Sequence, residues 1–98
     1  MIVERDWGTY ETIHENARFK VKILRIKPNY RHTEQRHLHR TEVWFWRDKD
    51  TGLPQTKFID YNEWHRIENR TDEWMEIIEI QKSWDDVGNV EEDIERRP

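Results

Sequence analysis

Short runs in which apolar and polar residues alternate predict a chain built from β-strands. At residues 19–23 the apolar positions alternate with lysines, and the phase then slips so that Leu24 and Ile26 are apolar. This pattern predicts a strand with a bulge. Further strands are predicted at 43–46, 57–60, 64–69 and 74–81, the last again with two phases, and turn sequences lie at 48–54 and 69–72. One helical turn is predicted at 93–96. Many short strands joined by turns are typical of an all-β sandwich or small barrel.

The composition places the chain near the lower limit for a stable core. Of its 98 residues 39% are charged and 34% are hydrophobic, but the opposite charges nearly cancel, at a net −4. Six tryptophans supply apolar volume that the aliphatic residues lack. A chain of this length buries enough surface for one core, so residues 1–98 are predicted to form a single domain.

Several functional classes are disfavoured by what the sequence lacks. It has no cysteine, which excludes disulfides, thiolate metal sites and a cysteine nucleophile. We expect neither a signal peptide nor a membrane span, and therefore a cytoplasmic protein that makes no membrane contact. Nucleic acid is not expected as a partner, because the basic residues between Arg25 and Arg40 do not gather on one strand face.

The stretch that suggests chemistry contains an H-x-H pattern. Side chains alternate along a strand, so Gln35, His37 and His39 are predicted to project from one face. Glu42 adds a carboxylate and His65 a third imidazole. The three imidazoles and the one carboxylate would suit Zn²⁺, Fe²⁺, Mn²⁺, Co²⁺ or Ni²⁺ and would suit Ca²⁺ or Mg²⁺ poorly. The H-x-H pattern alone is weak, because two solvated strand histidines would look the same.

The motifs resemble those of the cupin barrels, in the form found in the C-terminal domain of type II phosphomannose isomerases. Residues 35–44 resemble Q-x-H-x-H-R-[AS]-E-H-W, and residues 59–69 resemble I-P-x-G-x-x-H-[RS]-[LI]-E-N. Residues 7–11 resemble the opening W-G-[ST]-Y-E, residues 78–81 resemble I-E-V-Q, and residues 92–94 faintly resemble D-D-I. The resemblance implies a cupin-type double-stranded β-helix, a small jelly-roll barrel.

The sequence departs from the family pattern in three ways. Only 23 positions separate Glu42 from His65, fewer than is usual, which predicts a barrel shortened between the motifs and open on one side. Asp60 stands where the family pattern has Pro, and Asn62 and Asn29 stand where it has Gly. Asn is expected to accept the left-handed backbone conformation that Gly would supply. Val43 replaces the His of the H-W pair.

The resemblance implies a metal-dependent isomerase that interconverts mannose 6-phosphate and fructose 6-phosphate. The expected metal ligands are His37, His39, Glu42 and His65, with Gln35 as a fifth contact or an outer hydrogen-bond partner. Glu42 is the candidate base if it is only loosely bound to the metal, with Glu34 and Glu63 as weaker candidates. The sugar phosphate is expected to bind at one or more of three cations: Arg31, Arg40 and Lys22. Each of the three is equally compatible with a solvated strand face.

The remaining aromatic and charged residues have simpler interpretations. Trp7, Gly8 and Tyr10 are predicted to close one end of the barrel, and Trp44, Trp46 and Trp74 to fill the core or the interface of a homodimer. His14, His32 and the tail 91–97 are predicted to lie at the surface. Two alternatives to the isomerase remain open, a non-catalytic cupin that binds metal or sugar phosphate, and a structural interaction partner that retains the fold.

Overall fold

The chain folds almost entirely into β-strands in a computed structural model that describes residues 1–83 and 93–98. Among those residues no helix is long and apolar enough to cross a membrane. The strands in chain order are β1 (Ile2–Arg5), β2 (Gly8–Glu15), β3 (Phe19–Ile26), β4 (Tyr30–Arg31), β5 (Glu34–Arg36), β6 (Arg40–Arg47), β7 (Pro54–Ile59), β8 (Glu68–Asn69), β9 (Met75–Ser83) and β10 (Glu95–Arg97).

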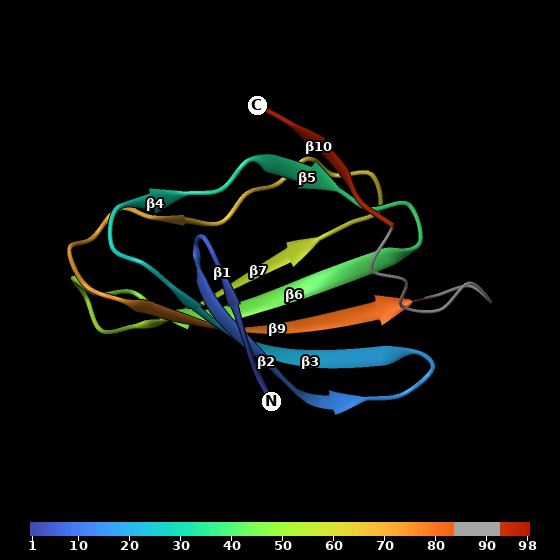
Figure 1. Cartoon of the computed structure of the whole chain (residues 1–98), viewed down its shortest axis with the longest axis horizontal. Coiled ribbons are helices and arrows are strands. Elements are labelled where there is room, and N and C mark those ends of the chain that lie inside the picture. Colours follow the sequence, from blue (N-terminus) through green and yellow to red (C-terminus); the bar gives the residue numbers. More distant parts are fainter. Residues whose placement is uncertain (84–92) are drawn as a thin grey trace.

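The strands form two layers that enclose the interior. One layer is a six-stranded sheet in the order β1-β2-β3-β9-β6-β7, with all neighbours antiparallel. The facing layer consists of two short two-stranded sheets, β10-β5 and β4-β8. Figure 1 shows this second layer above the sheet, with the C-terminal strand β10 beside β5. The prediction of an all-β fold is confirmed.

The inward face of the six-stranded sheet, which is turned toward the second layer, is polar at one end and apolar at the other. On β3 the buried side chains are Lys20, Lys22, Leu24 and Ile26, in unbroken alternation. The predicted bulge in this strand is therefore wrong, because the two lysines face inward where the pattern placed them outward. The same holds for β9, where Ile77, Glu79, Gln81 and Ser83 are buried in one phase. A polar interior leaves room for a site between the layers.

The apolar end holds the hydrophobic core. Leu24, Ile26, Trp44, Ile59 and Ile77 are buried together. Six partly buried residues pack against them: Trp7, Tyr10, Tyr30, Trp46, Ile67 and Met75. The predicted closing role of the N-terminal aromatics agrees with this packing. Trp74 does not fill the core, since 59% of its area is exposed, and its predicted place in a homodimer interface stays a prediction.

Several strand boundaries differ from the predictions. Within 64–69 only β8 is a strand. His65 makes an isolated bridge to Gln35, and the chain between His65 and β8 is irregular. The predicted helical turn at 93–96 is wrong, since residues 95–97 pair with β5 as β10. The short or strongly polar strands β1, β2 and β4 were not predicted, and the strand expected through Gln35, His37 and His39 is only β5, which ends at Arg36. Part of the predicted surface tail, residues 91–92, lies outside the described residues.

The expected left-handed asparagines are confirmed. Asn29 has φ 54° and Asn62 has φ 58°. In both turns a side chain that tolerates this conformation stands where the resembled motif has glycine. The turn that carries the second motif therefore keeps its shape.

The outer face of the large sheet presents apolar side chains in register. One row runs across four strands through Val21, Ile80, Val43 and Phe58, and Ile23, Ile78 and Phe45 begin the next row. Phe45, Phe58 and Ile78 are exposed. The homodimer stays a prediction, and this face is where it would place a second copy.

Asn69 connects the second motif to neighbouring backbone through hydrogen bonds, so we expect Asn69→Asp to lower the free energy of unfolding strongly. The residue is buried; its Nδ2 contacts the carbonyl oxygens of Ile26, Lys27 and Glu73 at 3.1, 2.9 and 2.8 Å, and its Oδ1 accepts from Thr71. A carboxylate cannot donate, so three acceptors would face a negative charge. We expect a loss of about 3 kcal/mol or more, roughly 12 to 24 °C in Tm, by thermal unfolding.

The matched control for this prediction is Asn16→Asp. Asn16 is exposed, and its Oδ1 accepts from the backbone N–H groups of Arg18 and Phe19, which a carboxylate does equally well. The free energy of unfolding of Asn16→Asp should differ from that of wild type by no more than about 0.5 kcal/mol, with a correspondingly small change in Tm. Equal losses in both variants would contradict the role given to Asn69.

Candidate metal and substrate site

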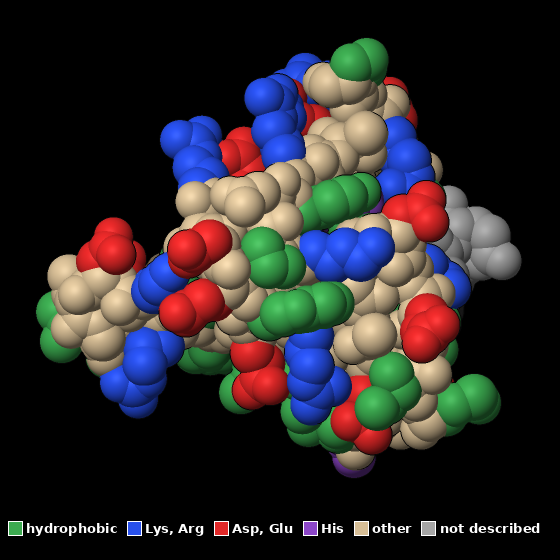
Figure 2. Space-filling view, turned by 60° about the vertical axis from the view of Figure 1, so that its left-hand side comes forward, with side chains coloured by type: hydrophobic (Ala, Val, Ile, Leu, Met, Phe, Trp, Pro, Cys, Tyr) green, Lys and Arg blue, Asp and Glu red, His purple; other side chains and the backbone are tan. Residues whose placement is uncertain are grey.

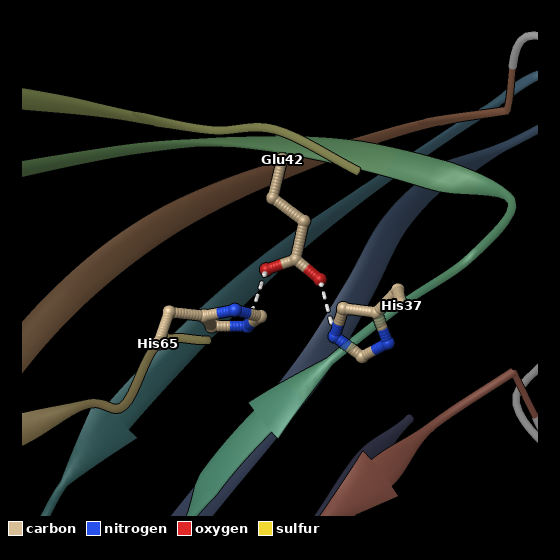
Figure 3. Close-up of side chains that lie close together, drawn as sticks. All are labelled: His37, Glu42 and His65. Atoms are coloured by element: carbon tan, nitrogen blue, oxygen red, sulfur yellow. Dashed lines mark ion pairs between the residues drawn. The ribbon is translucent and has the colours of Figure 1, made fainter. Parts of the chain in front are cut away.

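Three potential ligand side chains converge between the two layers. His37 follows β5, Glu42 lies on β6, and His65 lies in the segment before β8. Their ligand atoms all lie within 4.8 Å of one another, and all three residues are buried. Glu42 Oε2 lies 3.2 Å from His37 Nε2, and Glu42 Oε1 lies 3.8 Å from His65 Nε2. Figure 3 shows the carboxylate between the two rings.

Backbone carbonyls fix which nitrogen each ring turns into the site. His37 Nδ1 lies 2.6 Å from the carbonyl oxygen of Asp93, and His65 Nδ1 lies 2.9 Å from that of Glu63. A carbonyl oxygen only accepts, so each Nδ1 carries the proton and donates. Each Nε2 is therefore the ring nitrogen that is turned toward Glu42. This is the arrangement in which protein histidines usually bind a metal.

The ionisation of the group also suits a cation. Burial alone would raise the pKa of Glu42, but the hydrogen bond with His37 and the charge of Arg40 outweigh it and hold its pKa well below the usual range. Burial lowers the pKa of His65 despite the charge of Glu42. At neutral pH the site thus offers a carboxylate and, at His65, a neutral imidazole.

Arg40 supplies positive charge beside this group. Its Nε and Nη2 both lie 3.0 Å from Glu42 Oε2, and Nη2 lies 3.2 Å from His37 Nε2. Its remaining nitrogen, Nη1, is buried without a hydrogen-bond partner. The residue predicted to bind substrate thus lies directly beside the proposed metal ligands.

Gln35 and His39 are placed differently from one another. Gln35 lines the cavity beside the group, and its side-chain amide lies 2.8 Å from His32 Nδ1. His39 lies outside the group of three. The predicted common strand face of Gln35, His37 and His39 does not form, because β5 ends at Arg36 and the chain bends at residues 38–39.

The C-terminal segment holds the turn that carries His37. Both carboxylate oxygens of Asp93 accept backbone N–H groups, from Leu38 and from His39, each at 2.9 Å. The carbonyl oxygen of Asp93 accepts from His37 Nδ1. Asp93 thus acts on His37 from both its side chain and its backbone. The sequence signal for this role was the faint D-D-I resemblance.

A cavity of about 210 Å³ extends from the ligand group into the interior. Lys22 and Arg40, two of the three cations predicted to bind the sugar phosphate, line it, with aromatic walls from Trp7, Tyr10 and Tyr30. Sequence reasoning missed six polar residues of its lining: Arg5, His32, Arg66, Glu79, Gln81 and Arg96. His32 was expected at the surface, but it faces this space and contacts Gln35.

Three predicted site residues lie away from this cavity. The side chain of Arg31 is 67% exposed and lies 3.8 Å from Glu68. Glu34 pairs with Arg66 and Arg97. Glu63 accepts the backbone N–H of Asp60 within the turn. The structure therefore does not place Arg31, Glu34 or Glu63 among the side chains that line the cavity.

Glu79 is a second buried carboxyl in the cavity. Its Oε1 accepts from Trp44 Nε1 at 3.1 Å, and its Oε2 accepts from Gln81 Nε2 at 3.1 Å. Burial and the charge of Glu42 raise its pKa to about 8. A glutamate between Ile78 and Ile80 was the signal that this strand has a polar inner face.

This carboxyl should make the metal-free protein less stable as pH rises. The folded state keeps the Glu79 proton above the usual pKa of a glutamate, so it binds more protons than the unfolded chain between pH about 4.5 and 8. Stability contributed by Glu79 is therefore full below pH 4.5 and lost on going to pH 8. Between pH 4.5 and 8 we expect the Tm measured with chelator present to fall by roughly 10 °C or more beyond the fall in Glu79→Gln.

The control for the pH series is Glu76→Gln, on the outer side of the same strand. Glu76 is exposed and lies 3.4 Å from Arg25. The difference between wild type and this control should not change with pH in the same range. A Glu79→Gln variant that keeps the full pH slope would contradict the assignment of the proton to Glu79.

A second cavity, of about 400 Å³, opens on the other side of His65 and Trp44. Trp46 and Trp64 line it, and the guanidinium groups of Arg36 and Arg97 lie 4.7 and 4.0 Å from the centre of the Trp64 ring. Hydrophobic and basic side chains also alternate on the face seen in Figure 2. Cation–ring contacts of this kind keep exposed aromatic surface covered.

Comparison with known proteins identifies relatives across nearly the whole chain. Residues 1–97 match the family described as mannose-6-phosphate isomerase C-terminal. The chain is 36% identical over 105 aligned positions to the alginate biosynthesis protein AlgA of Pseudomonas aeruginosa, covering 96% of this chain and 21% of that protein. It is 30% identical to a mannose-1-phosphate guanylyltransferase of Salmonella muenchen, covering 81% and 19%. The chain thus spans about a fifth of the length of these relatives.

Solved structures with the same fold are more distant in sequence. A double-stranded β-helix protein from Klebsiella pneumoniae superposes with a TM-score of 0.64 at 12% identity, covering 89% of this chain and 81% of that one. An RmlC-like cupin protein from Ralstonia eutropha superposes with a TM-score of 0.53 at 15% identity, covering 90% and 64%. These matches confirm the cupin-type double-stranded β-helix.

Proposed function

Because this chain belongs to the mannose-6-phosphate isomerase C-terminal family, we propose that it is a metal-dependent aldose–ketose isomerase of sugar phosphates, with mannose 6-phosphate and fructose 6-phosphate as the substrate pair. The observation that supports this most is the buried group His37, Glu42 and His65, of which Glu42 and His65 line the cavity. The relatives named above are polysaccharide-biosynthesis and guanylyltransferase proteins.

The residues fit a divalent transition metal. Two imidazole Nε2 atoms, already turned inward by their Nδ1 bonds, and one carboxylate make a three-ligand set with room for a fourth. The amide oxygen of Gln35 is the proposed fourth ligand, in place of His39. When bound, such an ion polarises the sugar carbonyl and hydroxyl oxygens. A ring nitrogen has one lone pair, so ligation by His37 would release Arg40 Nη2 from that atom.

The chain's own residues would carry the proton and hold the anion. In the isomerisation a proton leaves C2 of the open-chain aldose and returns to C1, while a hydroxyl proton moves from O2 to O1. We assign the C2 proton to Glu79, acting in its ionised form, rather than to Glu42, because Glu79 lines the cavity and lies outside the ligand group. Lys22, Arg40 and Arg96 line the same cavity and are the proposed phosphate contacts.

The test is a proton-exchange assay on the isolated chain. The metal-loaded protein is mixed with mannose 6-phosphate in D₂O and followed by NMR, which detects fructose 6-phosphate and solvent deuterium at C1 and C2. We expect both in wild type and neither in Glu79→Gln or after chelation. Absence of both in a metal-loaded wild type would contradict the isomerase and favour the non-catalytic binding module.

A further inference from the structure

Two buried polar atoms in the described part of the chain have no hydrogen-bond partner, and both belong to residues that line the same cavity. They are Arg40 Nη1, a donor, and Gln81 Oε1, an acceptor. Arg40 is 7% exposed and Gln81 is 2% exposed. Buried polar groups are nearly always paired, so an unpaired donor and an unpaired acceptor in one cavity point to a ligand.

The two residues lie on neighbouring strands around the ligand group. Gln81 on β9 stands opposite Glu42 on β6, and Arg40 stands opposite Ser83 two positions along. Gln81 Nε2 donates to Glu79 Oε2, and Arg40 Nε donates to Glu42 Oε2. In each side chain one polar atom is thus held by a hydrogen bond while another, Gln81 Oε1 or Arg40 Nη1, has no partner. The unpaired atoms are fixed features of the wall.

We propose that Gln81 is a specificity-determining residue whose Oε1 accepts a hydroxyl of the substrate while Arg40 Nη1 donates to a substrate oxygen. This inference rests on the proposed function and names the residue that recognises the hydroxyls of its polyhydroxylated phosphate substrate. The cations Lys22, Arg40 and Arg96 favour an anion, but an anion without a hydroxyl leaves Gln81 Oε1 unpaired. The cavity therefore selects for the hydroxyls as well as for the charge.

The binding test uses a ligand that cannot be isomerised, a hexitol 6-phosphate, with inorganic phosphate as the second probe. Calorimetric titration of the metal-loaded chain should show that Gln81→Met weakens binding of the hexitol phosphate by about 3- to 10-fold, the value of one hydrogen bond. Affinity for inorganic phosphate should not change. The matched control is Gln55→Met on β7, a residue that lines neither cavity, and it should bind both probes as wild type does.

A second arm keeps the test independent of how well the variant folds. Hexitol 6-phosphates that lack one hydroxyl each are titrated into the unmodified chain, and one of them should show the same 3- to 10-fold loss as the Gln81 variant. That analogue should lose nothing further in Gln81→Met, because the bond is already absent.

Four results would overturn the inference: equal affinity of wild type and Gln81→Met for the hexitol phosphate, no binding of it by wild type, no loss with any analogue, or loss of the metal from Gln81→Met. The last would make Gln81 a metal ligand. Absence of isomerisation with this binding intact would overturn the proposed reaction and leave the inference standing.

Discussion

His37→Ala is expected to lower the affinity of the chain for Zn²⁺ or Co²⁺ by more than about 100-fold, because it removes a ligand that the fold has already oriented. The ring is 3% exposed, its Nδ1 is bonded to the carbonyl of Asp93, and its Nε2 faces Glu42. Loss of an outer partner of a metal ligand typically costs 10- to 100-fold, so loss of the ligand itself should cost more. Competition titration with a chelating dye measures the change.

The matched control is His14→Ala. His14 is exposed and lies outside the ligand group. Its metal affinity should equal that of wild type. Comparable losses in the two variants would mean that the measured metal is held by scattered surface histidines and not by the buried group.

Asp93→Ala is expected to lower metal affinity by about 10- to 100-fold although Asp93 is not a proposed ligand. Its carboxylate holds the N–H groups of Leu38 and His39, and its backbone carbonyl holds the ring of His37. Without the carboxylate, the carbonyl that orients the ring is no longer fixed to the turn. Asp93→Asn should give an intermediate loss, because an amide oxygen can replace one of the two acceptors but not both.

A second aspartate variant separates an effect on the position of His37 from the general effect of losing a carboxylate. Asp72→Ala removes an exposed carboxylate that is bonded to Lys49 and lines neither cavity. It should leave metal affinity unchanged. If Asp93→Ala binds metal as tightly as Asp72→Ala does, the C-terminal segment has no part in orienting His37.

The ligand group could be predicted from the sequence because its residues lie in two short motifs. His37, Glu42 and His65 are brought together as the motifs implied. The position of His39 outside this group could not be predicted from alternation, since alternation assumes that the strand continues past Arg36. The chain bends there because Asp93, from 54 residues further on, takes the N–H groups of the turn. Contacts of that range leave no local pattern.

The polar interior explains most of the remaining differences. Lys20, Lys22, Glu79 and Gln81 alternate correctly along their strands, but they face inward. A pattern that assumes an apolar interior therefore finds a phase slip where none exists. The same assumption hid Glu79 and Gln81 as site residues. Buried polar residues in a regular strand are the signal that a functional cavity lies behind the sheet.

The most direct test of the account is a crystal structure of the Co²⁺-loaded chain with an anomalous difference map. We predict one strong peak bound by Nε2 of His37, Nε2 of His65 and a carboxylate oxygen of Glu42, at the roughly 2.0 to 2.2 Å usual for such ligands. The amide oxygen of Gln35 should complete the set, with Arg40 displaced from His37. A strong peak at His39 that lacks those three residues, or no peak in the cavity, would contradict the account.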